Sequence, residues 1–366
     1  MKKTYIFLKE RPVLEIENYV CRILDYGRLP ISLRYEGVNY DDVIHGWTEN
    51  RTMSLGKTNA KKILAGFGIS QTNPYLVAKL FHFASLTDCY WMMEEGEEVL
   101  WKDVSLFRNR LERAVSSTAL LGSARHFYGE KKRIRQKIHT PELTAQGMSA
   151  KAWIRERGGM YLYKVGKKEL AASRILDALG ISHVGYEEVE EKRLVRIADQ
   201  KHVDKIKREQ EKVVRCRMIT SEQRAIVSWE DFQMYCAYHD IDEYAYVRTH
   251  EARAYYSMQI ADYILANEDR HGANFGFFMN NRSGRLGHLY PLMDHDHAFS
   301  EEEPIFCQTS EDEETLKEAA LQAAKQVDMA VGYQRVLQMG KPEEITDQQW
   351  AGVLERTREL VKENYQ

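Results

Sequence analysis

The feature that most constrains the fold of this chain is a short polar segment between two apolar stretches. Residues 267–278 read Asn-Glu-Asp-Arg-His-Gly-Ala-Asn-Phe-Gly-Phe-Phe, and they follow an apolar run with helical spacing at 252–265. Asp269 and Asn274 stand five positions apart, which is the D-x-x-x-x-N spacing of loops that catalyse phosphoryl transfer. In such a loop the aspartate accepts the proton of a substrate hydroxyl and the asparagine holds a magnesium ion. We therefore expect a loop that joins a buried helix to a strand and carries a base.

A hairpin pattern follows this loop and ends on a second acidic residue. Residues 275–279 and 286–293 read as strands around an Asn-Asn-Arg-Ser-Gly turn. Asp294 stands at the end of the return strand, so the hairpin delivers a carboxylate back beside the loop. A second metal ligand is required there for phosphoryl transfer, and Asp294 fits that role, with Asp296 as a helper.

Composition places the chain among ordinary globular proteins. Its 366 residues are 43% hydrophobic and 29% charged, which excludes a disordered, fibrous or membrane-embedded chain. The 52 basic and 55 acidic residues give a net charge of −3, so the total charge does not predict a polyanionic partner. The basic stretch at 130–137 lacks aromatic interleaving, and we interpret it as a solvated domain boundary, without direct nucleic-acid binding. Five scattered cysteines and the lack of a long apolar run predict a cytoplasmic protein without membrane contact.

Local patterns divide the chain into an N-terminal region, 1–125, and a second domain, 126–366. The second domain reads first as a β-rich lobe, at about 138–235, and then as a helical lobe, at about 236–366. The N-terminal region alternates strand-like and helical runs and has no chemical motif. The expected strands of the second domain include 159–166, 182–188 and 212–218, and its expected helices are 169–179, 252–265, 314–337 and a last one that Thr346 caps.

A strand lysine and a glycine-containing loop complete the pattern of a nucleotide site. Lys164 lies near the end of the strand at 159–166, where a cation can bind phosphates, and Glu169 in the next helix is its expected ion-pair partner. Each of these residue types also has a purely structural explanation, so their order along the chain carries the prediction of ATP and magnesium. The upstream loop offers a glycine, a hydroxyl and a second cation at Gly147, Ser149 and Lys151.

Over about residues 138–335, the sequence resembles the HipA-like serine/threonine kinases, which share a distant architecture with the phosphatidylinositol 3/4-kinases. The matching segments are Thr140–Thr144 with Gly147–Lys151, Tyr161–Lys164, Ile260–Asn267 with Asp269–Asn274, and Pro291–Asp294. The resemblance implies an α+β, bilobal protein-kinase-like fold with a small β-rich lobe and a helical C-terminal lobe, preceded here by an extra N-terminal α+β region. It also implies ATP- and magnesium-dependent transfer of the γ-phosphate to a Ser or Thr hydroxyl of a protein substrate.

The same resemblance implies roles for the residues of the catalytic loop. Asp269 would be the catalytic base, and Asn274 and Asp294 would hold magnesium. His271 belongs to the Asp-Arg-His form of this loop in the lipid-kinase relatives, where the histidine is catalytically important.

The resemblance further implies how ATP would bind. Lys164 and the loop from Gly147 to Lys151 would contact the phosphates, with Ser149 as a candidate autophosphorylation site that also fits an ordinary turn serine. The backbone of the next strand would bind adenine at Val214, Arg215 and Cys216.

Three other functions remain open from the sequence. One is a nucleotide-binding pseudokinase or interaction module that contacts a partner protein through residues 1–125, which do not resemble the N-terminal subdomain of the toxin kinases. Another is protein adenylylation on the same scaffold. The third is a metal-dependent hydrolase that uses His295 and His297, since a His-x-His pair on a strand places both rings on one face.

Overall fold

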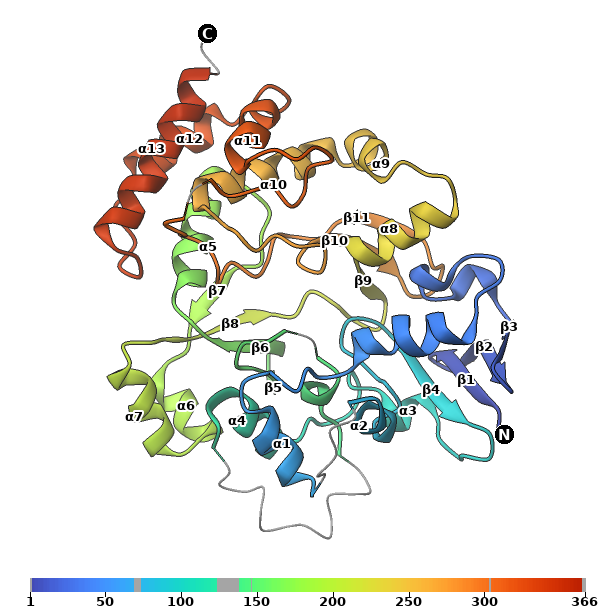
Figure 1. Ribbon diagram of the computed structural model, residues 1–366. Helices are drawn as coiled ribbons and strands as arrows, with labels where there is room; N and C mark the ends of the chain where they lie inside the picture. The colour runs from blue at the N-terminus through green and yellow to red at the C-terminus, as the bar shows by residue number, and fades with distance from the viewer. Residues whose placement is uncertain (1, 69–73, 124–137, 146, 303, 364–366) are drawn as a thin grey trace. The chain divides into compact units, whose positions relative to one another are not determined.

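The computed structural model describes residues 2–68, 74–123, 138–145, 147–302 and 304–363, and the basic stretch at 130–137 lies outside them (Figure 1). The chain divides into two compact units. Unit 1 consists of Met1–Val165, Glu188–Ile226 and Met279–Leu286, and unit 2 of Gly166–Glu187, Val227–Phe278 and Gly287–Gln366. Residues 1–125 therefore fall in the same unit as the strand that carries Lys164.

The N-terminal part of unit 1 is built on an antiparallel sheet with the strand order β3-β2-β1-β4. Its strands are β1 (Thr4–Leu8), β2 (Arg11–Glu17), β3 (Val20–Ile23) and β4 (Tyr90–Glu94). Phe7 stacks on Trp91 of the neighbouring strand, so aromatic cross-strand pairing stabilises this sheet. Short helices accompany it at α1 (Ala60–Gly66), α2 (Pro74–Leu80) and α3 (Trp101–Val104).

A second sheet, with the order β5-β6-β8-β7, carries the candidate nucleotide residues of unit 1. It is formed by β5 (Lys151–Glu156), β6 (Gly159–Val165), β8 (Val213–Arg217) and β7 (Tyr186–Glu188), the last at the boundary of the units. Helix α4 (Arg113–Leu121) packs on β5 and β6, and α1 packs on α4. Alternate residues of β5 are buried, and Ala152 and Ile154 join the core that α1 and α4 share with this sheet. The charged connection that precedes β8 contains α6 (Glu191–Ile197) and α7 (Gln200–Arg208).

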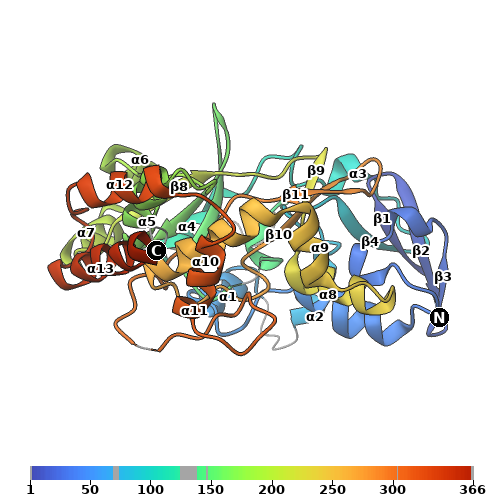
Figure 2. The same ribbon diagram turned by 90° about the horizontal axis from the view of Figure 1, so that it is seen from above.

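Unit 2 is mainly helical and surrounds α10 (Ala252–Leu265), which is buried almost all round. Helix α10 packs against α11 (Leu316–Ala324) and α13 (Asp347–Glu363), while α12 (Ala330–Gln338) contacts both α13 and α5 (Lys168–Leu179) (Figures 1 and 2). The remaining helices are α8 (Trp229–Tyr238) and α9 (Glu243–His250). No helix in the described part of the chain is long and apolar enough to cross a membrane.

A three-stranded sheet, with the order β11-β10-β9, contains the hairpin that follows the polar loop. Its strands are β9 (Arg224–Ser228), β10 (Gly276–Asn280) and β11 (Leu286–Leu289). The boundary between the two units falls within all three strands. The predicted hairpin is present, but its return strand ends at Leu289 and the chain reaches Asp294 as irregular backbone.

Several local predictions are confirmed and two are wrong. Helix α10 has the predicted bounds, and α5 ends at Gly180, whose φ of 73° suits a glycine C-cap. The helix expected at 314–337 is instead two helices, α11 and α12, because the backbone leaves the helical region before α12, with a φ of −126° at Met329. Asp328 accepts the Ala330 N–H at 3.0 Å at the start of the second helix. The strand expected at 182–188 is reduced to β7, and residue 183 forms only an isolated bridge to Leu292.

Candidate functional site

The polar loop of unit 2 begins where α10 ends and is fastened to the start of α8. Helix α10 ends at Ala266, in the left-handed region with a φ of 44°. The Trp229 N–H donates to the carbonyl oxygens of Gly272 at 2.8 Å and Phe275 at 2.9 Å. Gly276 has a φ of 153°, and a Cβ there would lie 2.1 Å from the Val227 oxygen. Only glycine therefore lets the chain leave the loop and enter β10 so close to its neighbour.

A buried ion pair organises this loop from inside. Arg270 is 2% exposed and Asp262 of α10 is fully buried. The Arg270 Nε and Nη2 atoms donate to the Asp262 carboxylate at 2.9–3.2 Å, and the Asn267 amide donates to the same carboxylate at 2.9 Å. Burial acts to lower the pKa of Arg270, but the Asp262 charge and hydrogen bonds outweigh it and raise the pKa. Asp262 is thus fully paired, which is what a buried carboxylate requires.

The same guanidinium connects the segments that carry the predicted metal ligands. Arg270 Nη1 donates to the Asn274 carbonyl oxygen at 3.2 Å and to the Met293 carbonyl oxygen at 2.6 Å, one residue before Asp294. The Asn274 Nδ2 atom donates to the Asp269 carbonyl oxygen at 2.8 Å. This bond uses the amide nitrogen, and no donor among the described residues contacts the amide oxygen. The amide oxygen is the atom of Asn274 that suits a metal.

Asp269 and His271 lie at the open side of the loop. Their side chains are 39% and 43% exposed, and the His271 Nε2 atom is 3.9 Å from the Asp269 Oδ2 atom. The Ala273 N–H donates to His271 Nδ1 at 3.2 Å, so in the neutral ring the proton is on Nε2 and faces Asp269. A solvent-accessible carboxylate can receive a proton from an external hydroxyl, which is the chemistry expected of Asp269.

Asp294 occupies an unusual backbone conformation between two fixed neighbours. Its φ is 62°, a left-handed value uncommon for residues other than glycine. On one side Arg270 binds Met293, and on the other the His295 N–H donates to the Glu169 Oε2 atom at 3.1 Å. Through this bond Glu169, which the sequence analysis expects to pair with Lys164, holds the segment of Asp294. Such over-determined conformations are common at functional sites.

The histidine after Asp294 belongs to the interior of unit 2. His295 is 1% exposed, and its ring Nδ1 lies 3.6 Å from the Glu169 carboxylate. Burial lowers the pKa of His295, although the Glu169 carboxylate acts in the opposite direction. His297 is exposed beside Glu268 at 3.7 Å, so the two histidines do not present their rings together.

In unit 1, Lys164 lies on the central part of the second sheet. It is 3% exposed and stands in register opposite Lys151 on β5 and Val214 on β8. The Arg215 guanidinium is bound to Glu156 at 2.6 Å and lies over the Tyr161 ring, so only the backbone of Arg215 suits the predicted adenine contact. Cys216 is a buried cysteine on the same strand.

The predicted phosphate loop of unit 1 contains a glycine, Gly147, at which any other side chain would force a neighbouring group to move. Gly147 has a φ of 88°, and a Cβ there would lie 2.4 Å from the Lys151 Nζ atom. The Lys151 ammonium therefore lies directly over the Gly147 backbone. Ser149 is half-buried in the same loop. A positive φ beside an ammonium is a geometry suited to binding an anion.

A second lysine, Lys57, lies at this loop, and no pattern in the sequence had singled it out. Lys57 is 3% exposed, and its Nζ atom donates to the Ala145 carbonyl oxygen at 3.4 Å, while the adjacent Thr58 N–H donates to the Met148 oxygen at 2.9 Å. Burial, and then the Lys151 charge, lower the pKa of Lys57 to about 8, with Glu142 acting in the opposite direction. The available signal was the Gly-Lys-Thr tripeptide at 56–58 before α1, although the first glycine of a phosphate-binding motif is missing.

The residues of each unit fit the ligands that the sequence predicts. No cluster of three or more His, Cys, Asp or Glu side chains suited to a metal occurs in the described ranges. Magnesium in phosphoryl-transfer sites usually takes one or two protein ligands and completes its shell with phosphate oxygens and water, which matches Asn274 and Asp294. In unit 1, the close approach at Gly147, the buried Lys57 ammonium and the half-buried Lys151 side chain match a phosphate chain.

Known structures resemble this chain in fold, whereas comparisons of its sequence find no match. No protein-family model matches the chain, and no curated protein matches it. HipA from the Shewanella oneidensis MR-1 toxin–antitoxin complex with HipB and operator DNA is 11% identical, with a TM-score of 0.50 over 99% of this chain and 96% of that one. The proinflammatory kinase CtkA of Helicobacter pylori is 14% identical (TM-score 0.36; 58% of this chain, 90% of that one). The Golgi casein kinase is 12% identical (TM-score 0.31; 60% and 70%).

The match to HipA confirms the expected fold class. The chain has a HipA-like, α+β kinase fold over nearly its whole length. Because the alignment covers 99% of the chain, it includes the N-terminal region, whose sequence had indicated a departure from the toxin kinases. At 11% identity the likeness concerns the fold alone, so the activity has to be argued from the residues.

Proposed function

We propose that this protein is a serine/threonine protein kinase, which transfers the γ-phosphate of ATP to a hydroxyl of a protein substrate with the help of magnesium. One observation carries the proposal: a single buried guanidinium, that of Arg270, binds the backbone of both predicted metal-ligand segments, at Asn274 and Met293. Arg270 itself is fixed by Asp262. Such preorganisation is the main contribution that a protein makes to phosphoryl transfer.

The residues of unit 2 would act on the reacting groups. Asp269 accepts the proton of the substrate hydroxyl, and the neighbouring His271 Nε2–H stabilises the charge near it. Asn274 and Asp294 hold magnesium, which neutralises the developing negative charge when it is bound. Because the loop is fixed before any ligand binds, little reorganisation is needed during the reaction.

The residues of unit 1 would bind the nucleotide. Lys164 and Lys151 bind the phosphates, together with the loop backbone at Gly147, which lies beside the Lys151 ammonium. We add Lys57 to this set, because it is a buried cation at the same loop whose ammonium has a single, long hydrogen bond within the described part of the chain. The backbone of Val214, Arg215 and Cys216 remains the proposed adenine contact.

The test uses purified protein, magnesium, and ATP labelled separately in the γ- and α-phosphates, with intact mass and gel detection. Asp269→Asn should abolish transfer of the γ label, because the amide cannot accept the proton. Asp312→Asn, an isosteric change at an exposed site in the same unit, should retain the transfer. Chelation of magnesium should stop the transfer in both proteins.

The other outcomes separate the alternative functions. Transfer of the α label would establish adenylylation and contradict the kinase assignment. A pseudokinase would bind magnesium and ATP, raising the melting temperature by linkage, but would transfer neither label to a library of peptide hydroxyls. Activity that persists in Asp269→Asn would contradict the role of the loop.

We also propose that a partner protein, rather than nucleic acid, contacts residues 1–125. The aligned HipA chain comes from a complex with HipB and operator DNA. In this chain the edge strand β3 begins beside the exposed apolar side chains of Tyr19 and Val20, 63% and 67% exposed. An apolar edge strand favours pairing with another chain. Affinity purification from the native cells should recover a partner that Val20→Lys loses, and a partner retained by Val20→Lys would contradict this surface.

The state of the cysteines supports the expected cytoplasmic location. No disulfide is formed among the described residues, and burial raises the pKa of Cys21 to about 11 and that of Cys236 to about 12, which keeps both as unreactive thiols. Reduced thiols of this kind fit a reducing compartment. Fractionation of the native cells tests the location directly.

A further inference from the structure

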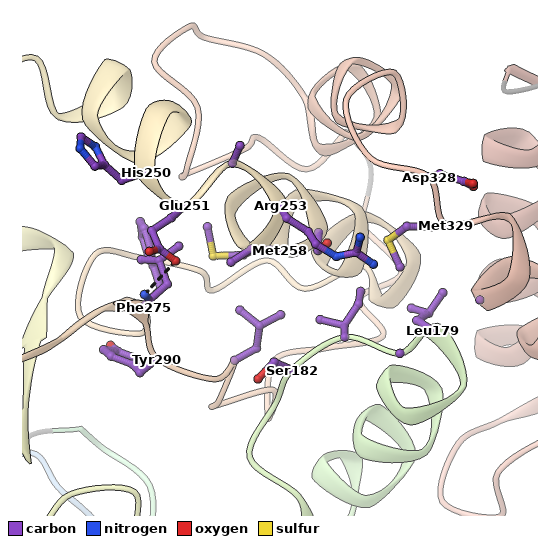
Figure 3. Close-up of a pocket in the computed structure, with 18 of the residues that line it drawn as sticks. Leu179, Ser182, His250, Glu251, Arg253, Met258, Phe275, Tyr290, Asp328 and Met329 are labelled. Atoms are coloured by element: carbon purple, nitrogen blue, oxygen red, sulfur yellow. Dashed lines mark hydrogen bonds between the residues drawn. The ribbon is translucent and has the colours of Figure 1, made fainter. Parts of the chain in front are cut away.

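Unit 2 contains a cavity that the proposed reaction does not use. It has a volume of about 630 Å³ and lies between the end of α5, the first half of α10, the start of α12 and the backbone around β10 and β11 (Figure 3). Its apolar lining includes Leu179, Met258, Phe275, Leu292 and Met329. The volume and the mainly apolar wall are typical of sites that bind a small organic molecule.

The acidic and basic groups at this cavity differ in how they are paired. Glu251 is engaged by the His288 ring at 2.8 Å and the Leu289 N–H at 3.3 Å, and Asp328 accepts the Ala330 N–H at 3.0 Å. Arg253 and Arg335 also line the cavity, and neither guanidinium has a hydrogen bond or ion pair with any described residue. Figure 3 shows the Arg253 side chain extending across the cavity toward Met329. The cavity therefore offers two unpaired positive charges above an apolar floor.

One wall of the cavity is formed by the backbone next to the candidate metal ligands. Phe275 and Gly276 directly follow Asn274, and Leu292 precedes Asp294 by two residues. Hydrogen bonds fix this wall, from the Tyr290 N–H to the Gly276 oxygen at 2.9 Å and from the Leu292 N–H to the Ser182 oxygen at 3.0 Å. A molecule packed against it contacts the same hairpin that positions Asn274 and Asp294.

We propose that this cavity binds an organic anion with an apolar body, its carboxylate or phosphate paired with Arg253 and Arg335, and that its occupancy strengthens binding of magnesium and ATP. An arginine guanidinium binds either anion through paired hydrogen bonds, and the floor buries the apolar body. The coupling follows because an occupant stabilises the hairpin in the conformation that carries Asn274 and Asp294. The anion site stands on the cavity alone, and only the coupling rests on the proposed function.

Calorimetric titration of the full chain tests the site with three probes, decanoate, decyl phosphate and uncharged decanol. We expect saturable binding of at least one of the two anions, weakened at least tenfold in the double variant Arg253→Gln/Arg335→Gln. Arg358→Gln, an exposed arginine elsewhere in unit 2, should bind as the wild type does. Ala254→Trp, at an exposed lining position on α10, should block the cavity and abolish binding while the charges remain.

Several results would overturn the proposal. These are a lack of saturable binding of both anions, equal affinity in the wild type and the double arginine variant, or decanol binding as tightly as the anions. The coupling is measured as the Kd of ATP with magnesium, which should fall at least threefold at saturating probe in the wild type only. An unchanged Kd overturns the coupling. A chain that binds the probe but never binds ATP would instead contradict the proposed kinase function and leave the anion site established.

Discussion

The candidate residues of the two units are stabilised in opposite ways. In unit 2, the Arg270 guanidinium and the Asp262 carboxylate are both buried, and each satisfies the other through several hydrogen bonds. In unit 1, the buried Lys57 ammonium has one hydrogen bond of 3.4 Å and a like charge nearby on Lys151. The first arrangement is complete without a ligand, whereas the second gains its best partner only when an anion binds. The proposed catalytic loop is thus fixed by its own contacts, whereas the proposed phosphate loop has a buried cation that an anion would pair.

Removing the centre of the unit 2 arrangement should have the largest effect. Arg270→Leu leaves Asp262 buried without its cation, so we expect the free energy of unfolding to fall by about 3–5 kcal/mol. Phosphoryl transfer should be lost, because the segments at Asn274 and Met293 lose their common donor. Urea unfolding and the labelled-ATP assay measure the two effects separately.

A double variant separates stability from positioning. In Asp262→Leu/Arg270→Leu both charges are absent, so most of the lost stability should return, because two apolar residues can replace a buried ion pair. The activity should remain absent. Recovery of activity in the double variant would mean that Arg270 serves the fold only, and the comparison between the units would fail.

Lys57→Met tests the unbalanced charge of unit 1. The affinity for ATP should fall at least tenfold, because a charge-assisted hydrogen bond to phosphate is lost. The free energy of unfolding at pH 7 should instead rise in this variant. The pKa of Lys57 is about 8 in the fold and 10.5 ordinarily, so between these values the unfolded chain binds more protons and the free energy of unfolding rises with pH. Below pH 8 the wild type carries the full cost of the buried charge, on the order of 3 kcal/mol, which the variant avoids.

The measurements are urea unfolding from pH 7 to 11 and calorimetric ATP titration at pH 7. Lys61→Met, an exposed lysine of α1, is the matched control and should change neither quantity. If Lys57→Met binds ATP as tightly as the wild type, Lys57 is a structural lysine and does not belong to the phosphate loop.

Gly147→Ala should have an intermediate effect confined to the loop. A Cβ at this position would displace the Lys151 ammonium and must also adopt a φ of 88°. We expect a stability loss of about 1–2 kcal/mol and an ATP affinity at least fivefold weaker. Gly96 has the same φ of 88° with no atom near its missing Cβ, so Gly96→Ala controls for backbone strain alone. Equal ATP affinities in the two variants would show that the close approach to Lys151 has no functional role.

The same contrast explains how much of the site could be predicted from the sequence. Asp269, Asn274 and Asp294 could be proposed from the sequence because a loop and a hairpin place them by local spacing. The role of Arg270 was not found, although it lies inside the same loop, because its partner Asp262 lies in the preceding helix and looks like an ordinary polar residue there. Lys57 is 88 positions from Ala145, a separation at which no local pattern predicts contact.

The fold shows the same limit. Helices α5 and α10 follow clear apolar periodicity and had nearly correct bounds. The break between α11 and α12 is instead a local feature around Met329, where the backbone leaves the helical region and Asp328 accepts the Ala330 N–H. Periodicity reports which face of an element is buried, but it does not report where a side chain ends one helix and starts another.

The smallest expected effect concerns Ser149, and it tests whether cations and glycine alone define the phosphate loop of unit 1. Ser149→Ala should leave the free energy of unfolding within about 0.5 kcal/mol of the wild type, and the ATP affinity within about twofold, because a half-buried turn hydroxyl contributes little. The mass gained during incubation with magnesium and ATP, measured on the intact chain, should be the same for both proteins. A phosphate present on the wild type and missing from Ser149→Ala would instead make this serine an acceptor of the transferred phosphate. The proposed phosphate loop would then be a substrate of the kinase as well as part of its nucleotide site.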